Sequence, residues 1–220
     1  MPPRLMTDYN PPRKPLVVIH NDEDLLLVDK PSGLLSVPGK PAAHADCLEA
    51  RARAEFPDAL LIHRLDLETS GIMVFALNKN AQKAINRQFE KRIVRKVYVA
   101  RVAGSVSGDE GLIDLPLIAD WPNRPMQKVC FETGKPARTA WRVLKRNADA
   151  TRLELKPETG RSHQLRVHLK ELGHPILGDP FYASDAMFRA APRLQLHAQS
   201  LELRHPTGGA WRRWEAPCPF

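Results

Sequence analysis

Short apolar runs of strand length are mixed irregularly with three helical stretches along this 220-residue chain, and this order limits the folds open to it. Because strands and helices do not alternate regularly, a parallel β/α architecture is not expected. The pattern predicts an α+β fold with a mainly antiparallel, mixed sheet flanked by helices and loops. Strands are expected on both sides of the turn 21–24 and at 72–77, 96–103, 137–146, 151–157 and 194–203, and helices at 46–56, 78–92 and 162–172.

The first fifteen residues differ from the rest, because five of the twenty prolines fall there. We expect residues 1–15 to form a flexible arm and residues 16–220 to form a single domain, since no repeat or linker interrupts them. No run approaches the roughly 20 apolar residues of a membrane span, and no secretory signal is recognisable. The three cysteines lack a CxxC spacing, which argues against disulfides and structural zinc. We therefore expect a soluble protein of a reducing cytoplasm. We also expect it to be a monomer.

The charge of the chain points to a polyanionic partner. Thirty-three Lys and Arg against 25 Asp and Glu give a net charge of +8. Binding to phosphates releases counterions, so this excess favours nucleic acid, with surface solubilisation as the alternative. The expected helix 78–92 carries a cation at every fourth position, which forms the basic ridge of Lys79, Lys83, Arg87 and Lys91. We expect this ridge to contact phosphates; a solvated helix face is the other interpretation.

Several catalytic motifs are absent from the sequence. It contains no GxxxxGK[ST] or GxGxxG phosphate loop, no HExxH and no zinc deaminase signature. His163 and His168 lie five residues apart, a spacing that does not suit a metal-binding pair on one helix face. We expect neither a metal ion nor a nucleotide or other cofactor.

The stretch HRLDLETSG, from His63 to Gly71, places three charged residues between two apolar runs. Its central Asp66 has three interpretations. In the first, Asp66 is a turn carboxylate that caps backbone amides. In the second, it forms a glycosidase pair with Glu68. In the third, it is a lone nucleophile or base that a nearby arginine keeps ionised.

Two further segments carry candidate functional residues. KVYVARVAG, from Lys96 to Gly104, is an expected strand with Tyr98 on one face, where the ring either fills the core or stacks on a nucleobase. TGRSHQLRVH opens an expected helix whose first amides are oriented to bind an anion. It contributes Arg161 and Arg166, which are either surface and locally paired residues or cationic partners of a reacting group.

These three segments together resemble the RluA family of pseudouridine synthases. They match that family's HRLDxxTSG, KxYxAxVxG and TGR[ST]HQ[IL]RxH motifs, and DKPSGLLSVPG, GHPILGD and RLQLHA agree in the family's order. The resemblance extends from about Val17 to Pro206. It implies the pseudouridine synthase fold with a central active-site cleft. The few residues before the first motif leave no room for the S4 RNA-binding domain of larger members.

The resemblance also implies a role for each matched residue. Asp66 would be the essential aspartate, and Tyr98 would stack on the target base and help to remove its C5 proton. Arg166 would form a salt bridge with Asp66, and Arg161 is the alternative. Arg64 would hold the target nucleotide out of the RNA stack. Further substrate contacts are expected from His63, Arg161, Lys83 and Arg87.

Pseudouridine formation breaks the N1–C1′ bond of uridine, turns the base and joins C5 to C1′. Nothing is oxidised or hydrolysed overall, so no cofactor is required, in agreement with the missing motifs. An ionised Asp66 would either attack C1′ or remove the C2′ proton to form a glycal, and both routes stay open. Flipping the base costs a few kcal/mol. The basic ridge and the segment WPNRPMQK, residues 121–128, would offset this cost through phosphate and stacking contacts.

The resemblance thus predicts an RNA uridine-to-pseudouridine isomerase. The short chain and the segment 120–137 most resemble family members that modify both 23S ribosomal RNA and a tRNA anticodon stem-loop. One alternative is a non-catalytic RNA-binding or ribosome-assembly protein. The other is a nucleoside hydrolase or glycosidase, which would release free uracil.

Overall fold

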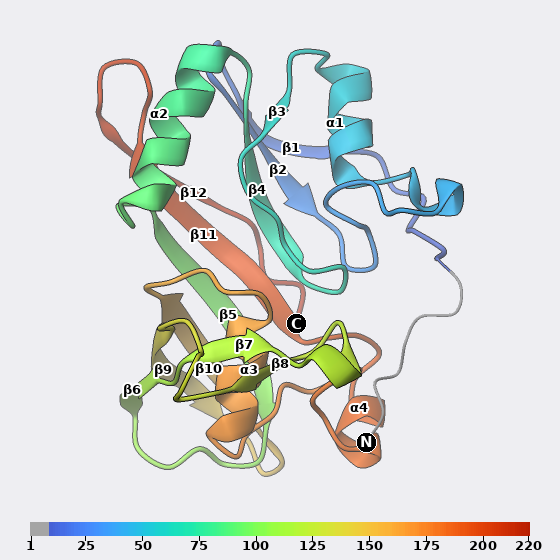
Figure 1. Cartoon of the computed structure of the whole chain (residues 1–220), viewed down its shortest axis with the longest axis vertical. Helices are drawn as coiled ribbons and strands as arrows, with labels where there is room; N and C mark the ends of the chain where they lie inside the picture. Colours follow the sequence, from blue (N-terminus) through green and yellow to red (C-terminus); the bar gives the residue numbers. More distant parts are fainter. Residues whose placement is uncertain (1–8) are drawn as a thin grey trace. The chain divides into compact units, whose positions relative to one another are not determined.

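The computed structural model describes residues 9–220, which group into two compact units (Figure 1). The N-terminal unit holds the described residues up to Lys96 together with His197–Pro219, and the central unit holds Val97–Leu196 and Phe220. The predicted arm, residues 1–15, lies partly outside the described residues. Its described portion is anchored, because the Tyr9 hydroxyl donates to the Asp46 carbonyl oxygen at 2.7 Å.

The sheet of the N-terminal unit has the strand order β1–β2–β4–β11–β12, and the short strand β3 also pairs with β4. All of these pairs are antiparallel except β4 with β11, which is parallel. Every residue of β4 is buried. The strands are β1 (Val17–Asn21), β2 (Leu25–Lys30), β3 (Leu60–Leu61), β4 (Ser70–Ala76), β11 (Leu196–Arg204) and β12 (Trp211–Glu215).

Two α-helices belong to the N-terminal unit, α1 (Leu48–Glu55) and α2 (Lys79–Glu90), with a short 3-10 turn, η1 (Ala42–His44). The α2 helix begins after Asn78, whose side-chain oxygen accepts a hydrogen bond from the Ala81 amide at 2.8 Å. The buried residues of α2 are Ala81, Ile85 and Gln88.

The central unit has an antiparallel sheet in the order β5–β10–β9–β6 and a separate two-stranded sheet, β7–β8. Side chains of β5, β10 and α3 form its main core, which includes Ala100, Leu153, Leu165 and Leu169. The elements are β5 (Arg95–Ala103), β6 (Glu110–Asp114), β7 (Leu117–Ala119), η2 (Trp121–Asn123), β8 (Gln127–Val129), β9 (Arg138–Arg146), β10 (Ala150–Pro157), α3 (Gln164–Glu171) and α4 (Asp185–Arg189).

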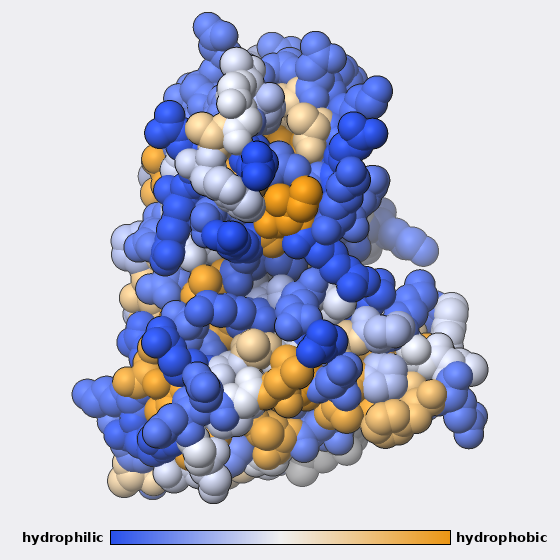
Figure 2. Space-filling view, turned by 90° about the vertical axis from the view of Figure 1, so that its left-hand side faces the viewer, coloured by the Kyte–Doolittle hydropathy of each residue, from blue (hydrophilic) through white to orange (hydrophobic). Residues whose placement is uncertain are grey.

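The predicted α+β class with a mainly antiparallel, mixed sheet is confirmed. The expected helix 162–172 begins later, at Gln164, because His163 adopts a left-handed backbone conformation with φ +52°. Hydrophilic residues cover most of the face drawn in Figure 2, where hydrophobic residues show only in small groups. None of the helices in residues 9–220 combines the length and apolar character that a membrane span requires.

Candidate active site

Asp66 lies in the loop between β3 and β4 of the N-terminal unit, where its side chain is half-buried. A hydrogen bond within the loop stabilises a turn, since the Thr69 amide donates to the Asp66 carbonyl oxygen at 3.1 Å. Leu65 and Thr69 are buried, whereas Arg64 is exposed. Within the HRLDLETSG segment, Leu65 and Thr69 therefore pack into the interior, whereas Arg64 faces the solvent.

A fully buried lysine holds the backbone directly after Asp66. The Lys30 ammonium donates hydrogen bonds to the carbonyl oxygens of Pro31 at 3.0 Å, Leu34 at 2.6 Å and Leu67 at 2.9 Å. Three acceptors match the three N–H donors of an ammonium group, which compensates the charge for its lost hydration. The DKPSG segment thus fixes the Asp66 loop, a contact that the sequence did not indicate.

Two serines of the same segment bind the loop on both sides of the aspartate. The Ser36 hydroxyl donates to the Leu65 carbonyl oxygen at 2.7 Å and accepts from the Leu65 amide at 3.1 Å. The Ser32 hydroxyl lies 2.8 Å from the Glu68 carbonyl oxygen and 3.0 Å from its carboxylate. Glu68 is therefore engaged in holding the loop, which weakens its interpretation as the second carboxylate of a glycosidase pair.

The end of the motif requires a glycine because β4 and β11 approach closely there. Gly71 has φ +115°, and a Cβ atom on it would lie 2.2 Å from the Ala198 carbonyl oxygen. Next to it, the Ser70 hydroxyl contacts His197 Nδ1 at 2.9 Å, and His197 Nε2 lies 3.1 Å from the Ala216 carbonyl oxygen. Since that carbonyl only accepts, Nε2 carries the proton and Nδ1 accepts from Ser70.

His63 opens the loop as a neutral imidazole. Burial, reinforced by the charge of Lys96, lowers the pKa of His63 to about 3. Its Nε2 accepts a hydrogen bond from the Val74 amide at 3.1 Å, and its ring stacks on Phe89 with centroids 5.1 Å apart. These contacts join the start of the loop to β4 and α2, and the expected contact of His63 with substrate stays a prediction.

All four side chains of the basic ridge on α2 are exposed. Among the described residues, no carboxylate lies within salt-bridge distance of any of them. The ridge therefore lies at the surface of the N-terminal unit without a carboxylate partner among the described residues.

Tyr98 lies on β5 of the central unit, in the strand that the sequence predicted. It is half-buried, pairs in register with Leu155 of β10 and packs against the main core of the unit. Its neighbour Val99 is fully buried. The ring is thus held by the sheet at the edge of the core.

Arg166 lies on α3 and is almost completely buried. Its Nε and Nη2 donate to the two carboxylate oxygens of Asp179 at 2.8 and 2.7 Å, and its guanidinium lies 4.9 Å from the Phe181 ring centroid and 5.2 Å from that of Tyr182. This bidentate ion pair fixes the plane of the Arg166 guanidinium. Sequence reasoning missed Asp179 as a partner, although its motif, GHPILGD, was recognised.

Arg161 precedes α3 and is half-buried. Its amide donates to the Gln164 side-chain oxygen at 3.0 Å, and its Nε donates to the Pro136 carbonyl oxygen at 3.2 Å. These contacts orient the turn that carries Arg161. The predicted pairing of Asp66 with Arg166, or with Arg161, stays a prediction.

The predicted site residues divide between the two units. The N-terminal unit holds His63, Arg64, Asp66, Lys83 and Arg87, and the central unit holds Tyr98, Arg161 and Arg166. Within residues 9–220, no group of three or more His, Cys, Asp or Glu side chains is arranged to hold a metal ion.

Known proteins that are similar to this chain in sequence include RNA pseudouridine synthases. The family model described as RNA pseudouridylate synthase matches residues 24–171. Dual-specificity RNA pseudouridine synthase RluA of Salmonella typhi is 55% identical over 217 residues, which cover 98% of this chain and 99% of the relative. The protein of the same name from Escherichia coli K12 is 54% identical with the same coverage, and that of Vibrio vulnificus is 52% identical over 98% of this chain and 88% of the relative.

Two solved structures share the fold. Human RNA Pseudouridylate Synthase Domain Containing 1 superimposes with a TM-score of 0.79 and 30% identity, over 93% of this chain and 84% of that one. Human RNA Pseudouridylate Synthase Domain Containing 4 gives a TM-score of 0.73 and 26% identity, over 92% and 88% of the two chains.

Proposed function

The chain belongs to the family of RNA pseudouridylate synthases, and from that membership we propose which residues carry out the reaction and on which RNAs they act. It is an RNA pseudouridine synthase, an isomerase that converts uridine to pseudouridine within an RNA chain. The comparisons support this catalytic function over a non-catalytic RNA-binding protein.

We assign the first chemical step to Asp66. The observation that carries this assignment is the loop around it, whose backbone Lys30, Ser32 and Ser36 hold on both sides. A carboxylate held in place needs little reorganisation when it attacks C1′ of the target uridine or removes its C2′ proton. The proposal covers both routes, because each begins from the ionised carboxylate.

Tyr98 and Arg166 complete the proposed catalytic set. The Tyr98 ring stacks on the target base, and its hydroxyl assists removal of the C5 proton in the last step. Arg166 keeps Asp66 ionised, with Arg161 as the alternative. Asp179 engages two of the five guanidinium donors of Arg166, so the remaining three serve other acceptors in a fixed orientation.

Substrate binding is assigned to exposed cations of the N-terminal unit. Arg64 holds the flipped nucleotide out of the stack, and Lys83 and Arg87 of the basic ridge contact phosphates. His63 contributes by fixing the loop that carries Arg64.

The substrates that we propose are 23S ribosomal RNA and a tRNA anticodon stem-loop. Support comes from relatives named as dual-specificity enzymes that align with almost all of this chain. Those relatives are bacterial, so we also propose that the enzyme acts in the cytoplasm, and that it does so as a monomer.

The test is the Asp66→Asn variant, assayed by release of tritium from RNA that contains [5-³H]uridine. Asparagine keeps the size of the side chain but neither attacks C1′ nor accepts the C2′ proton, so we expect no turnover above background. Asp109→Asn, a change at an exposed carboxylate of the central unit, serves as the control and should retain turnover. Turnover of Asp66→Asn close to wild type would contradict the assignment, and release of free uracil would indicate a hydrolase.

A further inference from the structure

The most exposed large apolar side chains of the described residues flank one small element. Phe131 is 76% exposed and Trp121 is 66% exposed, and they lie just after β8 and just after β7 of the two-stranded sheet. Both rings are therefore available for contact with a binding partner. This β7–β8 hairpin includes the segment 121–128 that the sequence singled out.

The tip of the hairpin is held in one conformation. The Asn123 amide donates to the Asp120 carbonyl oxygen at 2.9 Å, the Met126 amide donates to the Asn123 carbonyl oxygen at 3.0 Å, and the Asp120 amide donates to the Met126 carbonyl oxygen at 2.9 Å. The Asp120 carboxylate also accepts from the Asn123 side chain at 2.8 Å. Trp121 is therefore presented from an ordered turn, so its use in binding requires little loss of backbone entropy.

A cation covers one face of the exposed indole. The guanidinium carbon of Arg124 lies 3.2 Å from the Trp121 ring centroid. This cation–π contact places the guanidinium, with its N–H donors, beside the ring. The Trp121 ring and the Arg124 guanidinium thus lie side by side at the surface.

The hairpin is fastened to the turn that carries Arg161. Leu117 and Val129 of the hairpin pack with Val167 of α3 and with Tyr182. The Tyr182 hydroxyl accepts from the Gln127 amide at 2.8 Å and lies 2.8 Å from His163 Nδ1. Within the central unit, Trp121 is thus rigidly connected to the TGRSHQ segment.

We propose that the β7–β8 hairpin is an RNA-binding arm in which Trp121 stacks on an unpaired nucleobase and Arg124 contacts the adjoining phosphate. An unpaired base is the fitting partner, because a paired base is already covered on both faces by its neighbours in the helix. The net charge of +8 favours RNA over a protein partner, and the hairpin contributes Arg124 and Lys128, the second of which also lies 3.5 Å from the Asp120 carboxylate. The proposal rests on the proposed function, since it concerns the same RNA substrates.

Binding is measured in the Asp66→Asn background, so that the RNA is not altered during the assay. The probes are a synthetic anticodon stem-loop RNA and a fully paired duplex of its stem. Loss of one base stack should raise the Kd of Trp121→Ala for the stem-loop about 10-fold, whereas the Kd for the duplex should not change. Trp121→Phe, which keeps a ring, should recover most of the affinity. The control is Leu144→Ala, at an exposed apolar residue of β9.

The role of Arg124 has a separate readout. Arg124→Ala should lower the slope of log Kd against log salt by about one unit, as expected for one lost phosphate contact, and Trp121→Ala should leave the slope unchanged. Wild-type affinity of Trp121→Ala for the stem-loop, or equal loss on the duplex, would overturn the proposal. A change in oligomeric state on Trp121→Ala would assign the surface to a second copy instead. These outcomes do not depend on whether Asp66→Asn retains turnover.

Discussion

At the scale of single residues, Lys30 has the clearest structural consequence. Its buried ammonium satisfies three carbonyl oxygens, and the Leu67 carbonyl among them belongs to the residue that follows Asp66. Lys30→Met keeps the aliphatic stem but leaves these carbonyls without their donor. We expect the free energy of unfolding to fall by about 3 kcal/mol, because hydrogen bonds from a charged donor are lost in the interior.

The measurement is urea unfolding followed by circular dichroism. Lys40→Met, at an exposed lysine directly after the segment DKPSGLLSVPG, serves as the matched control and should unfold like wild type. Equal stability of the two variants would show that Lys30 does not hold the loop as described.

The motifs singled out Asp66, Tyr98 and the two arginines as candidate site residues, but they did not indicate the supporting partners of these residues. The contact of Lys30 with Leu67 and that of Arg166 with Asp179 join residues from separate motifs. Residue type and spacing do not reveal such pairings, because the folded backbone alone brings the partners together.

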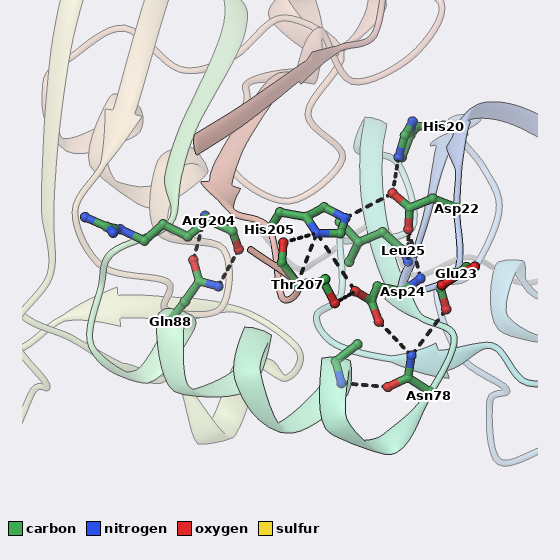
Figure 3. A network of polar contacts seen from close by, with 11 residues as sticks. His20, Asp22, Glu23, Asp24, Leu25, Asn78, Gln88, Arg204, His205 and Thr207 are labelled. Atoms are coloured by element: carbon green, nitrogen blue, oxygen red, sulfur yellow. Dashed lines mark hydrogen bonds and ion pairs between the residues drawn. The ribbon is translucent and has the colours of Figure 1, made fainter. Parts of the chain in front are cut away.

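At the scale of elements, a polar network joins the β1–β2 turn, the start of α2 and the β11–β12 hairpin (Figure 3). The Asp24 carboxylate accepts from the Asn78 side chain at 2.8 Å and from the Thr207 hydroxyl at 2.6 Å. The Asp22 carboxylate lies 2.6 Å from His20 Nε2 and 3.0 Å from His205 Nε2. The cap residue of α2 is thereby bound to two turns distant in sequence.

This network predicts a pH-dependent stability. Burial alone would lower the pKa of His205, but its hydrogen bonds to Thr207 and Asp22, with the charges of Asp22 and Asp24, raise it. Burial alone would raise the pKa of Asp22, but hydrogen bonds from His20, two backbone amides and His205 lower it. The contribution of His205 is complete below its unfolded pKa of about 6.5 and is lost as the pH rises through its raised folded pKa. That of Asp22 is complete above its unfolded pKa of about 3.9 and is lost as the pH falls.

The Asp22→Asn variant tests this dependence. The difference in unfolding free energy from wild type should be largest between about pH 4 and pH 6.5, and it should shrink on either side of that range. Urea unfolding at acidic, mildly acidic and mildly alkaline pH measures it. A difference that stays constant across these conditions would contradict the role assigned to the charged pair.

The basic ridge of α2 carries a prediction about RNA binding. Replacing Lys83 and Arg87 together with Ala should weaken binding and lower the salt slope by about two units, one for each lost phosphate contact. The control is the double variant Lys40→Ala and Lys145→Ala, which changes the net charge equally at two other exposed positions. If both double variants reduce affinity and slope alike, the ridge acts only through net charge.

Most elements could be predicted from the sequence, because apolar periodicity determines them locally. The expected strand 96–103 and the expected helix 78–92 agree with β5 and α2 to within two residues. The hairpin β7–β8 was not expected as strands, since each of its strands has only three residues. So short a segment carries no readable periodicity, and its packing on Val167 and Tyr182 stabilises it.

At the scale of the whole molecule, the sequence identified the reaction, and the expected single domain 16–220 stays a prediction. The resemblance covered 17–206, and relatives align over 98% of the chain. The division into two units has no compositional mark, because the chain leaves the N-terminal unit within β5 and returns to it within β11. A boundary inside a strand contains no linker for sequence analysis to detect.

The central claim is that this chain isomerises uridines in RNA through Asp66, and its most direct test is a map of pseudouridines in total RNA. Cells that lack the protein are compared with the same cells supplied with the wild type or with Asp66→Asn at equal expression. We predict that the wild type restores pseudouridine at sites in both ribosomal RNA and tRNA, and that Asp66→Asn restores it at none. Restoration by Asp66→Asn would contradict the account.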